Sequence, residues 1–455
     1  MPFVSINPAT GRTIHRYRAH TPGQIQTALA HTHSAFLGWR ELALSERAKH
    51  LHALATQLRH ERDTLADLIV AEMGKPVVQA RLEIEKCANT CDFYARHSAR
   101  YLKPERPLGA PRHARVVFEP MGVLLAIMPW NFPFWQVFRA AAPALMAGNT
   151  LLLKHASNVS GCALAIEAVC QRAGVPAGVL RTVLADTGAV PALIADPRVR
   201  LVSLTGSTRA GKQVGALAGA ALKPCVFELG GSDPYLILPD ADLAHAAATC
   251  ATARLINGGQ SCISAKRLIV VESARAEFEQ RLVAEFARRT MGDPLLAETD
   301  VGPMARSDLR RDLHAQVTAS VRAGARLLLG GKIPAGAGFH YPPTVLTDVR
   351  PGMPAHDEEL FGPVAAILSV PDTEAAIAVA NASPFGLGAA IFTRSRRLGE
   401  TIARERLDVG MAFVNDFVRS DPTLPFGGVK ESGYGRELGG FGIRALVNAK
   451  TVWVR

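Results

Sequence analysis

Cys262 lies in a glycine-rich stretch that could support covalent chemistry. Residues 257–263 read NGGQSCI, and glycines let backbone N–H groups approach a reacting oxygen. A lone cysteine is usually a small buried hydrophobe, and we expect this of most of the seven cysteines in the chain. The setting of Cys262 instead favours a nucleophile.

A carboxylate upstream could act as the base for this thiol. Residues 226–231, VFELGG, have the pattern of a buried strand that ends on Glu228 and two glycines. A thiol in a tight turn and a carboxylate at a strand end form a nucleophile-and-base pair if the fold joins them.

Two further polar residues follow apolar runs. Asn131 lies in PWNFP at 129–133, where its amide could donate to an oxyanion. Lys154 ends the run 150–153. A lysine there is usually a solvated strand end, but it also lies on the edge where a parallel sheet binds ligands.

A possible phosphate-binding turn follows another strand. Residues 206–212, GSTRAGK, fit a phosphate loop, but Gln213 stands where a magnesium-binding Ser or Thr belongs. This excludes a nucleoside triphosphatase, although the helix start can still hold a pyrophosphate. No G-x-G-x-x-G follows any expected strand.

The secondary structure expected to position these residues changes along the chain. Residues 21–102 are expected to be helical, with starts at Thr21 and Ser45, a stop at Gly74 and a third helix from 82 to 101. From residue 122, short apolar strands alternate with helices, which predicts parallel sheet covered on both faces. In the first region, the expected strands are 123–127, 150–153, 179–184, 201–204 and 226–229, and the expected helices between these strands are about 133–147, 159–173 and 207–221. In a second region, the expected strands are 236–238, 268–271, 326–329 and 364–370.

Length, charge and cysteine usage set broad limits. A chain of 455 residues is too long for one ordinary core. The net charge of +11 favours anionic ligands, and because the basic residues are scattered we expect no nucleic acid partner. The odd cysteine count without Cys-x-x-Cys favours a reducing, cytoplasmic setting and no metal site. We expect no signal peptide or membrane span, since no run of about 18 apolar residues occurs.

Six short blocks occur in the order typical of one enzyme superfamily. The six blocks are PWNFP at 129–133, LTGS at 204–207, ELGG at 228–231, GQSC at 259–262, ELFGP at 359–363 and PFGGVK at 425–430. On these blocks, the chain resembles the NAD(P)-dependent aldehyde dehydrogenases over essentially its whole length. Residues 154–159 (KHASNV), 420–422 (SDP) and 432–438 (SGYGREL) resemble the bacterial succinate-semialdehyde dehydrogenases more closely.

The resemblance implies an α/β architecture with three parts. A Rossmann-like cofactor domain would comprise residues 1–102, 123–229 and 426–447, and a catalytic domain residues 230–425. A bridging β element would comprise residues 103–122 and the C-terminal strand 448–455, which we expect to join subunits in a homodimer or homotetramer.

The expected reaction begins with the Cys262 thiolate attacking an aldehyde carbon. The oxyanion would lie against Asn131, hydride would pass to the nicotinamide to leave a thioester, and Glu228 would activate water. By resemblance, Glu359 holds the nicotinamide ribose and Phe361 packs near the nicotinamide. The remaining residues expected at the cofactor are Met128, Trp130, Lys154, Ser157, Gly206, Ser207 and Leu229.

Cofactor preference is expected to depend on Ser157. NAD-preferring relatives often carry Glu at this position, which would repel a 2′-phosphate. Ser157 removes that charge and Lys154 supplies a cation, so we expect NADP to be preferred and NAD to be a weaker substitute. The alternative is that Ser157 merely caps the following helix.

The helix at 133–147 is expected to line the substrate tunnel with Gln136 and Arg139. An Arg among apolar neighbours is costly unless it meets an anion, with an internal ion pair as the alternative. The resemblance favours succinate semialdehyde, with its carboxylate at Arg139 and a hydrogen bond from Ser420. Another aldehyde, an acyl-CoA-forming reaction and a cofactor-binding protein without catalysis stay open as alternatives.

Overall fold

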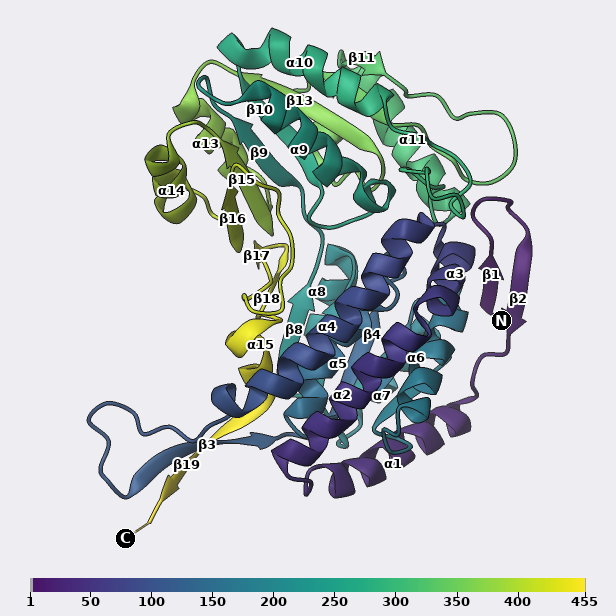
Figure 1. The fold of residues 1–455 in the computed structure, drawn as a ribbon, viewed down its shortest axis with the longest axis vertical. Coiled ribbons are helices and arrows are strands. Elements are labelled where there is room, and N and C mark those ends of the chain that lie inside the picture. The colour runs from purple at the N-terminus through teal and green to yellow at the C-terminus, as the bar shows by residue number, and fades with distance from the viewer. Residues whose placement is uncertain (1–2, 455) are drawn as a thin grey trace.

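The computed structural model describes residues 3–454 and arranges them around two β-sheets (Figure 1). One sheet has six strands in the order β18-β8-β7-β4-β5-β6, and the other has seven in the order β11-β12-β13-β10-β9-β15-β16. The predicted α/β class is confirmed. Helices pack against both sheets, and a two-stranded arm projects away from them.

The N-terminal part contains four helices where the sequence predicted three. Thr21 caps the first with a full capping box, and left-handed Gly74 ends the third, both as predicted. The prediction that Ser45 caps the second helix is wrong, because that helix begins one residue earlier after Ala43. The last helix begins at Val77, directly after Pro76, and not at Leu82. The helices are α1 (Pro22–Trp39), α2 (Leu44–His60), α3 (Arg62–Met73) and α4 (Val77–Tyr101).

The six-stranded sheet follows from continuous apolar runs that are buried on both faces. In β4 (Val123–Met128), Leu124 and Ala126 join the core under α2, α4 and α5, whereas Val123 and Leu125 join the core under α1, α7 and α8. The other strands are β5 (Thr150–His155), β6 (Leu180–Val183), β7 (Val199–Thr205), β8 (Cys225–Glu228) and the antiparallel β18 (Gly433–Tyr434). The helices between them are α5 (Trp135–Met146), α6 (Ser160–Arg172), α7 (Val190–Ala195) and α8 (Thr208–Ala220). All five predicted strands are confirmed within two residues at each end.

The seven-stranded sheet is built in the same way. Tyr235 and Ile237 face one core, and Leu236 faces the other. Its strands are β9 (Asp233–Ile237), β10 (Ala265–Val271), β11 (Arg326–Leu329), β12 (Thr344–Thr347), β13 (Val364–Val370), β15 (Gly388–Phe392) and β16 (Met411–Val414), of which β11 alone is antiparallel. Its helices are α9 (Leu243–Leu255), α10 (Glu272–Ala287), α11 (Ser307–Arg322), α12 (Pro354–Asp357), α13 (Thr373–Asn381) and α14 (Arg396–Glu405).

The projecting arm pairs two distant segments. β3 (Ala114–Pro120) runs antiparallel to β19 (Val447–Trp453), at the end of the chain (Figure 1). The smaller elements are β1 (Phe3–Ile6), β2 (Thr13–Tyr17), β14 (Phe385–Gly386), β17 (Val429–Lys430) and α15 (Gly439–Arg444). Within residues 3–454, no helix has the length and apolar character that crossing a membrane requires.

Candidate active site

Cys262 lies between α9 and β10, on a loop with unusual backbone geometry. After α9, Asn257, Gly258 and Gly259 all have positive φ, at 57°, 59° and 71°. A Cβ atom on Gly259 would lie 2.3 Å from the Gly362 carbonyl oxygen, so only glycine fits there. The tight turn leaves Cys262 partly exposed at the start of β10.

Asn131, which the sequence predicted to donate to an oxyanion, is held against this loop. Its side-chain Nδ2 donates to the Gln260 carbonyl oxygen at 3.0 Å, and Asn257 Nδ2 donates to the Asn131 carbonyl oxygen at 2.7 Å. These bonds join the end of β4 in one sheet to the thiol loop of the other. The second N–H of the Asn131 amide remains available to an oxyanion.

A cavity of about 260 Å³ extends from Cys262 between α4, α5 and the segment 417–420. Its walls include the rings of Phe132, Trp135 and Phe417. Gln136, Arg139 and Ser420, which the sequence predicted at the substrate, all line it. The cavity therefore brings together the predicted nucleophile and the three predicted substrate residues, which lie up to 284 residues apart in the chain.

Arg139 is buried and carries an internal ion pair. Its Nε contacts the Glu437 carboxylate, and its Nη2 donates to Thr205 Oγ1 at 3.2 Å. The guanidinium also lies 4.5 Å from the centre of the Phe426 ring. The ion-pair alternative left open by the sequence is thus formed, and contact between Arg139 and a substrate stays a prediction.

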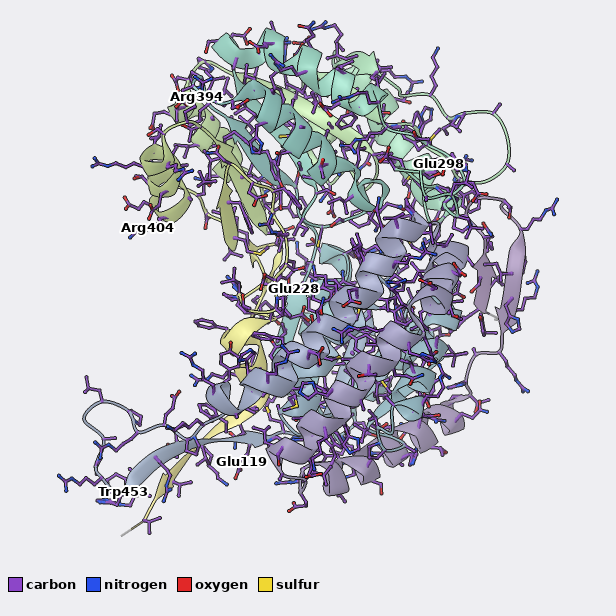
Figure 2. All side chains as sticks on the ribbon, in the orientation of Figure 1. Glu119, Glu228, Glu298, Arg394, Arg404 and Trp453 are labelled. Carbon is purple, nitrogen blue, oxygen red and sulfur yellow. The ribbon has the colours of Figure 1, made fainter. Side chains whose placement is uncertain are left out.

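Glu228 ends β8 at the same sheet edge as Asn131, and Figure 2 shows it where the two sheet-bearing regions meet. The side chain is 1% exposed, and neither carboxylate oxygen has a hydrogen-bond partner among the described residues. Burial and the nearby Glu437 carboxylate raise the pKa of Glu228 well above its usual range, and the Arg139 charge opposes this. Glu228 therefore favours its protonated form before a substrate enters.

The Cys262 thiol also favours its neutral form. Burial raises its pKa to about 12, and the positive charges of Arg139 and Lys266 oppose this shift. A proton must therefore leave the thiol before the sulfur can attack. The charges of Glu359 and Glu228 both lie close enough to raise this pKa further, so either carboxylate, when ionised, can receive such a proton.

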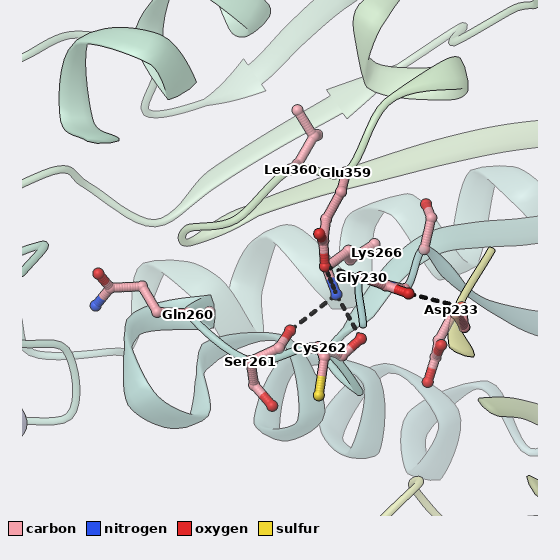
Figure 3. A network of polar contacts seen from close by, with 12 residues as sticks. Gly230, Asp233, Gln260, Ser261, Cys262, Lys266, Glu359 and Leu360 are labelled. Atoms are coloured by element: carbon pink, nitrogen blue, oxygen red, sulfur yellow. Dashed lines mark hydrogen bonds and ion pairs between the residues drawn. The ribbon is translucent and has the colours of Figure 1, made fainter. Parts of the chain in front are cut away.

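Lys266 links the thiol loop to Glu359 (Figure 3). Its Nζ donates to the carbonyl oxygens of Ser261 and Cys262 at 2.8 and 2.7 Å, and lies 3.2 Å from Glu359 Oε1. Glu359 Oε1 also accepts a hydrogen bond from the Gly231 amide at 3.1 Å. In Figure 3 the Cys262 sulfur points away from the Lys266 amine, so Lys266 holds the backbone of the loop and leaves the thiol free to react.

The residues expected at the adenosine end of a dinucleotide lie along one edge of the six-stranded sheet. Lys154 is half-buried at the end of β5, with no carboxylate in ion-pair range among the described residues. Burial lowers its pKa, opposed by Asp186. Ser157 is exposed in the next turn. An unpaired ammonium at this edge fits a phosphate ligand.

A helix N-terminus completes that edge. Gly206 follows β7, and Ser207 caps α8 by accepting a hydrogen bond from the Ala210 amide at 3.3 Å. The first turn of α8 thus presents free N–H groups at the expected pyrophosphate position. Leu229 packs against Gly211 of the same helix, where a Cβ atom would lie 2.4 Å from Leu229 Cδ1.

The aromatic residues expected near a nicotinamide lie together. The Trp130 and Phe361 rings meet edge to face, with centroids 5.7 Å apart. Met128 lies buried at the end of β4, where its carbonyl oxygen accepts from the Ala156 amide at 2.9 Å. This side of the Cys262 loop therefore fits the nicotinamide ring of a dinucleotide, and the sheet edge fits the phosphates of the same dinucleotide.

Sequence reasoning missed three charged residues at this site: Lys86, Lys266 and Glu437. Lys86 follows the helical pattern of α4, Lys266 interrupts an apolar strand, and Glu437 lies in the matched block 432–438 without a role assigned to it. A lysine inside a buried strand was the one local signal that could have been noticed, because such a charge requires partners.

Comparison with known proteins agrees with this arrangement. The sequence model of the aldehyde dehydrogenase family matches residues 1–452. The chain is 49% identical to an NAD(P)+ succinate semialdehyde dehydrogenase of Escherichia coli, covering 99% of this chain and 97% of that one. It is 46% identical to a probable NADP(+) succinate-semialdehyde dehydrogenase of Synechocystis, with both chains fully covered.

Solved structures have the same fold. The succinic semialdehyde dehydrogenase of Streptococcus pyogenes, solved in complex with NADP+, superposes with a TM-score of 0.96 and is 35% identical, with 99% of each chain covered. The family match, the identities and the shared fold agree with one another. The chain belongs to the aldehyde dehydrogenase family.

Proposed function

We propose that this chain oxidises succinate semialdehyde to succinate and uses NADP in preference to NAD. The observation that carries the proposal is the cavity at Cys262, which is apolar along its walls and lined by three basic side chains, Lys86, Arg139 and Arg419. Its one acidic lining residue, Glu83, is buried and paired with Lys75. A short aldehyde with a distal carboxylate fits this cavity, because its aldehyde group can meet the thiol while its carboxylate lies in the positive potential of the basic side chains.

In the proposed reaction, Cys262 gives up its proton and its sulfur adds to the aldehyde carbon. The free N–H of the Asn131 amide stabilises the negative charge that develops on the aldehyde oxygen. When bound, the nicotinamide supplies the acceptor for the hydride that leaves this carbon. Cys262 then carries the product as a thioester.

Hydrolysis completes the cycle. Glu228 takes a proton from water, the water oxygen adds to the thioester carbon, and the C–S bond breaks to return Cys262 and release the acid. Glu228 must lose its own proton before it acts, and its raised pKa then makes the carboxylate a stronger base. Retention of this base favours water over coenzyme A as the acyl acceptor.

Lys154, Ser157 and the start of α8 would hold the adenosine phosphates, with Gly206 and Ser207 at the pyrophosphate. Glu359 would hold the nicotinamide ribose, between Trp130, Phe361 and Leu229. A serine at 157 and an unpaired ammonium at 154 support a 2′-phosphate there, and the relatives named for NADP support the same preference.

We also propose that the arm joins subunits of a homodimer or homotetramer. β19 and β3 form an isolated two-stranded sheet, and Trp453 is 53% exposed. Two strands alone are marginal in water and expose their edges. The cytoplasmic setting expected from the cysteines stays a prediction.

Steady-state formation of NADPH tests the proposal. The purified chain is assayed with succinate semialdehyde and with butanal, each with NADP and with NAD. A charged hydrogen bond predicts a kcat/KM roughly ten- to hundredfold higher for succinate semialdehyde than for butanal. Equal efficiency on the two aldehydes would refute the substrate, and no turnover with NADP would refute the cofactor preference.

A further inference from the structure

Lys86 is a cation of the substrate cavity without a carboxylate partner. It lies on α4 and lines the same cavity as Cys262. Its Nζ donates to Ser420 Oγ at 2.6 Å and lies 4.3 Å from the centre of the Trp135 ring. No Asp or Glu of residues 3–454 lies within ion-pair distance of it.

The other cations of the cavity already have anionic partners. Arg139 is paired with Glu437, and Arg419 lies 2.7 Å from Asp416. Lys75, buried near the start of α4, is paired with Glu83. Of the three basic side chains that line the cavity, Lys86 is thus the one without a carboxylate in ion-pair distance among the described residues.

An ammonium drawn out of water without a counter-ion is unfavourable. Burial and the Arg139 charge accordingly lower the pKa of Lys86 to about 8, and the more distant charges of Glu83 and Asp421 oppose only part of this shift. The ring of Trp135 and the Ser420 hydroxyl offset part of this cost. An anion entering the cavity would offset the rest, and Cys262, where the aldehyde is proposed to react, lines the same cavity.

We propose that Lys86 binds the distal carboxylate of the substrate and, with Ser420, sets the selectivity for an acidic aldehyde. This inference rests on the proposed oxidation of succinate semialdehyde. Because Lys86 donates to Ser420 Oγ, the hydroxyl proton of Ser420 stays free to donate to the same carboxylate. Arg139 acts on that carboxylate mainly through its charge, since its Nε is committed to Glu437.

The test compares substrate selectivity in variants at position 86. The measured quantity is kcat/KM for succinate semialdehyde divided by kcat/KM for butanal. Lys86→Met should lower this ratio roughly ten- to hundredfold, mostly through KM for succinate semialdehyde. Lys86→Arg should keep most of it, because the cation remains. Lys49→Met removes the same charge from an exposed position on α2, where Lys49 is paired with Glu46, and should keep the wild-type ratio.

The ratio also separates this inference from the proposed function. A wild type without preference for succinate semialdehyde would refute the proposed substrate itself. A wild-type preference that Lys86→Met retains within about threefold would refute the role of Lys86 alone. Lys86→Gln, which keeps a donor for Ser420, provides a second neutral variant if the Met variant does not fold, and it should lose selectivity to a similar extent.

Discussion

Replacing Glu228 by Gln should separate the two halves of the reaction. The amide has nearly the shape of the carboxyl group, so the substitution creates no cavity around the buried side chain. The thioester should still form on Cys262 and release one equivalent of NADPH. Its hydrolysis should slow, because the amide cannot accept a proton from water. A burst followed by a slow steady rate is the expected result.

Glu228→Gln should change both the steady rate and the pH dependence of folding stability. Loss of a general base costs about 10²–10⁴-fold in the steady rate. Because burial raises the pKa of Glu228 in the folded state, the folded chain holds a proton that the unfolded chain loses above pH 4 to 5. Wild-type stability therefore falls as pH rises through this window, by about 1.4 kcal/mol for each pH unit below the folded pKa. Glu228→Gln removes this loss, so its stability relative to wild type should increase from pH 5 upwards.

Rapid mixing with excess succinate semialdehyde measures the burst, and thermal unfolding between pH 5 and 8 measures stability. Glu277→Gln, at an exposed ion pair on α10, provides the control. It should match wild type in the burst and in the pH dependence of thermal stability. A Glu228→Gln enzyme with a wild-type steady rate would refute the role of Glu228 as the base. A Tm of Glu228→Gln that falls relative to the wild-type Tm as pH rises would refute the buried, protonated carboxyl.

Three further substitutions test the rest of the site. Cys262→Ala should abolish both the burst and turnover while NADP still quenches tryptophan fluorescence; any remaining turnover would exclude covalent catalysis. Ser157→Glu should move the NADP-to-NAD ratio of kcat/KM towards NAD by about tenfold or more, since a charge repulsion of about 1.4 kcal/mol suffices, and an unchanged ratio would place the 2′-phosphate elsewhere. Lys266→Met should raise the pH midpoint for alkylation of Cys262, because the lysine charge lowers the pKa of that thiol, and should raise KM for NADP through Glu359. Lys266→Arg should partly restore the wild-type alkylation midpoint and the wild-type KM for NADP. An unchanged alkylation midpoint in Lys266→Met would contradict the electrostatic effect of Lys266 on Cys262.

The sequence by itself determined the features that depend on neighbouring residues. Continuous apolar runs predicted the strands β4 to β8, and Thr21 and Gly74 marked a helix start and a helix stop. The glycines before Cys262 predicted a tight turn for the same reason, since a positive φ is a property of the residue itself. Prediction failed at Ser45, which is the second residue of α2 and not its cap.

Only the tertiary structure decided which charges meet. Whether Arg139 faces a substrate or an internal carboxylate depends on Glu437, 298 residues away, which the short strand β18 brings beside β8. Likewise, Lys86 has the spacing of an ordinary helix residue, and it becomes a cavity cation only because α4 packs against α5 and the segment around Ser420. Helix and strand patterns record which face of an element is apolar, whereas the pairing of buried charges is a property of the space between elements. The sequence therefore determined the turn and predicted the nucleophile on it, and the fold decided the electrostatics around them.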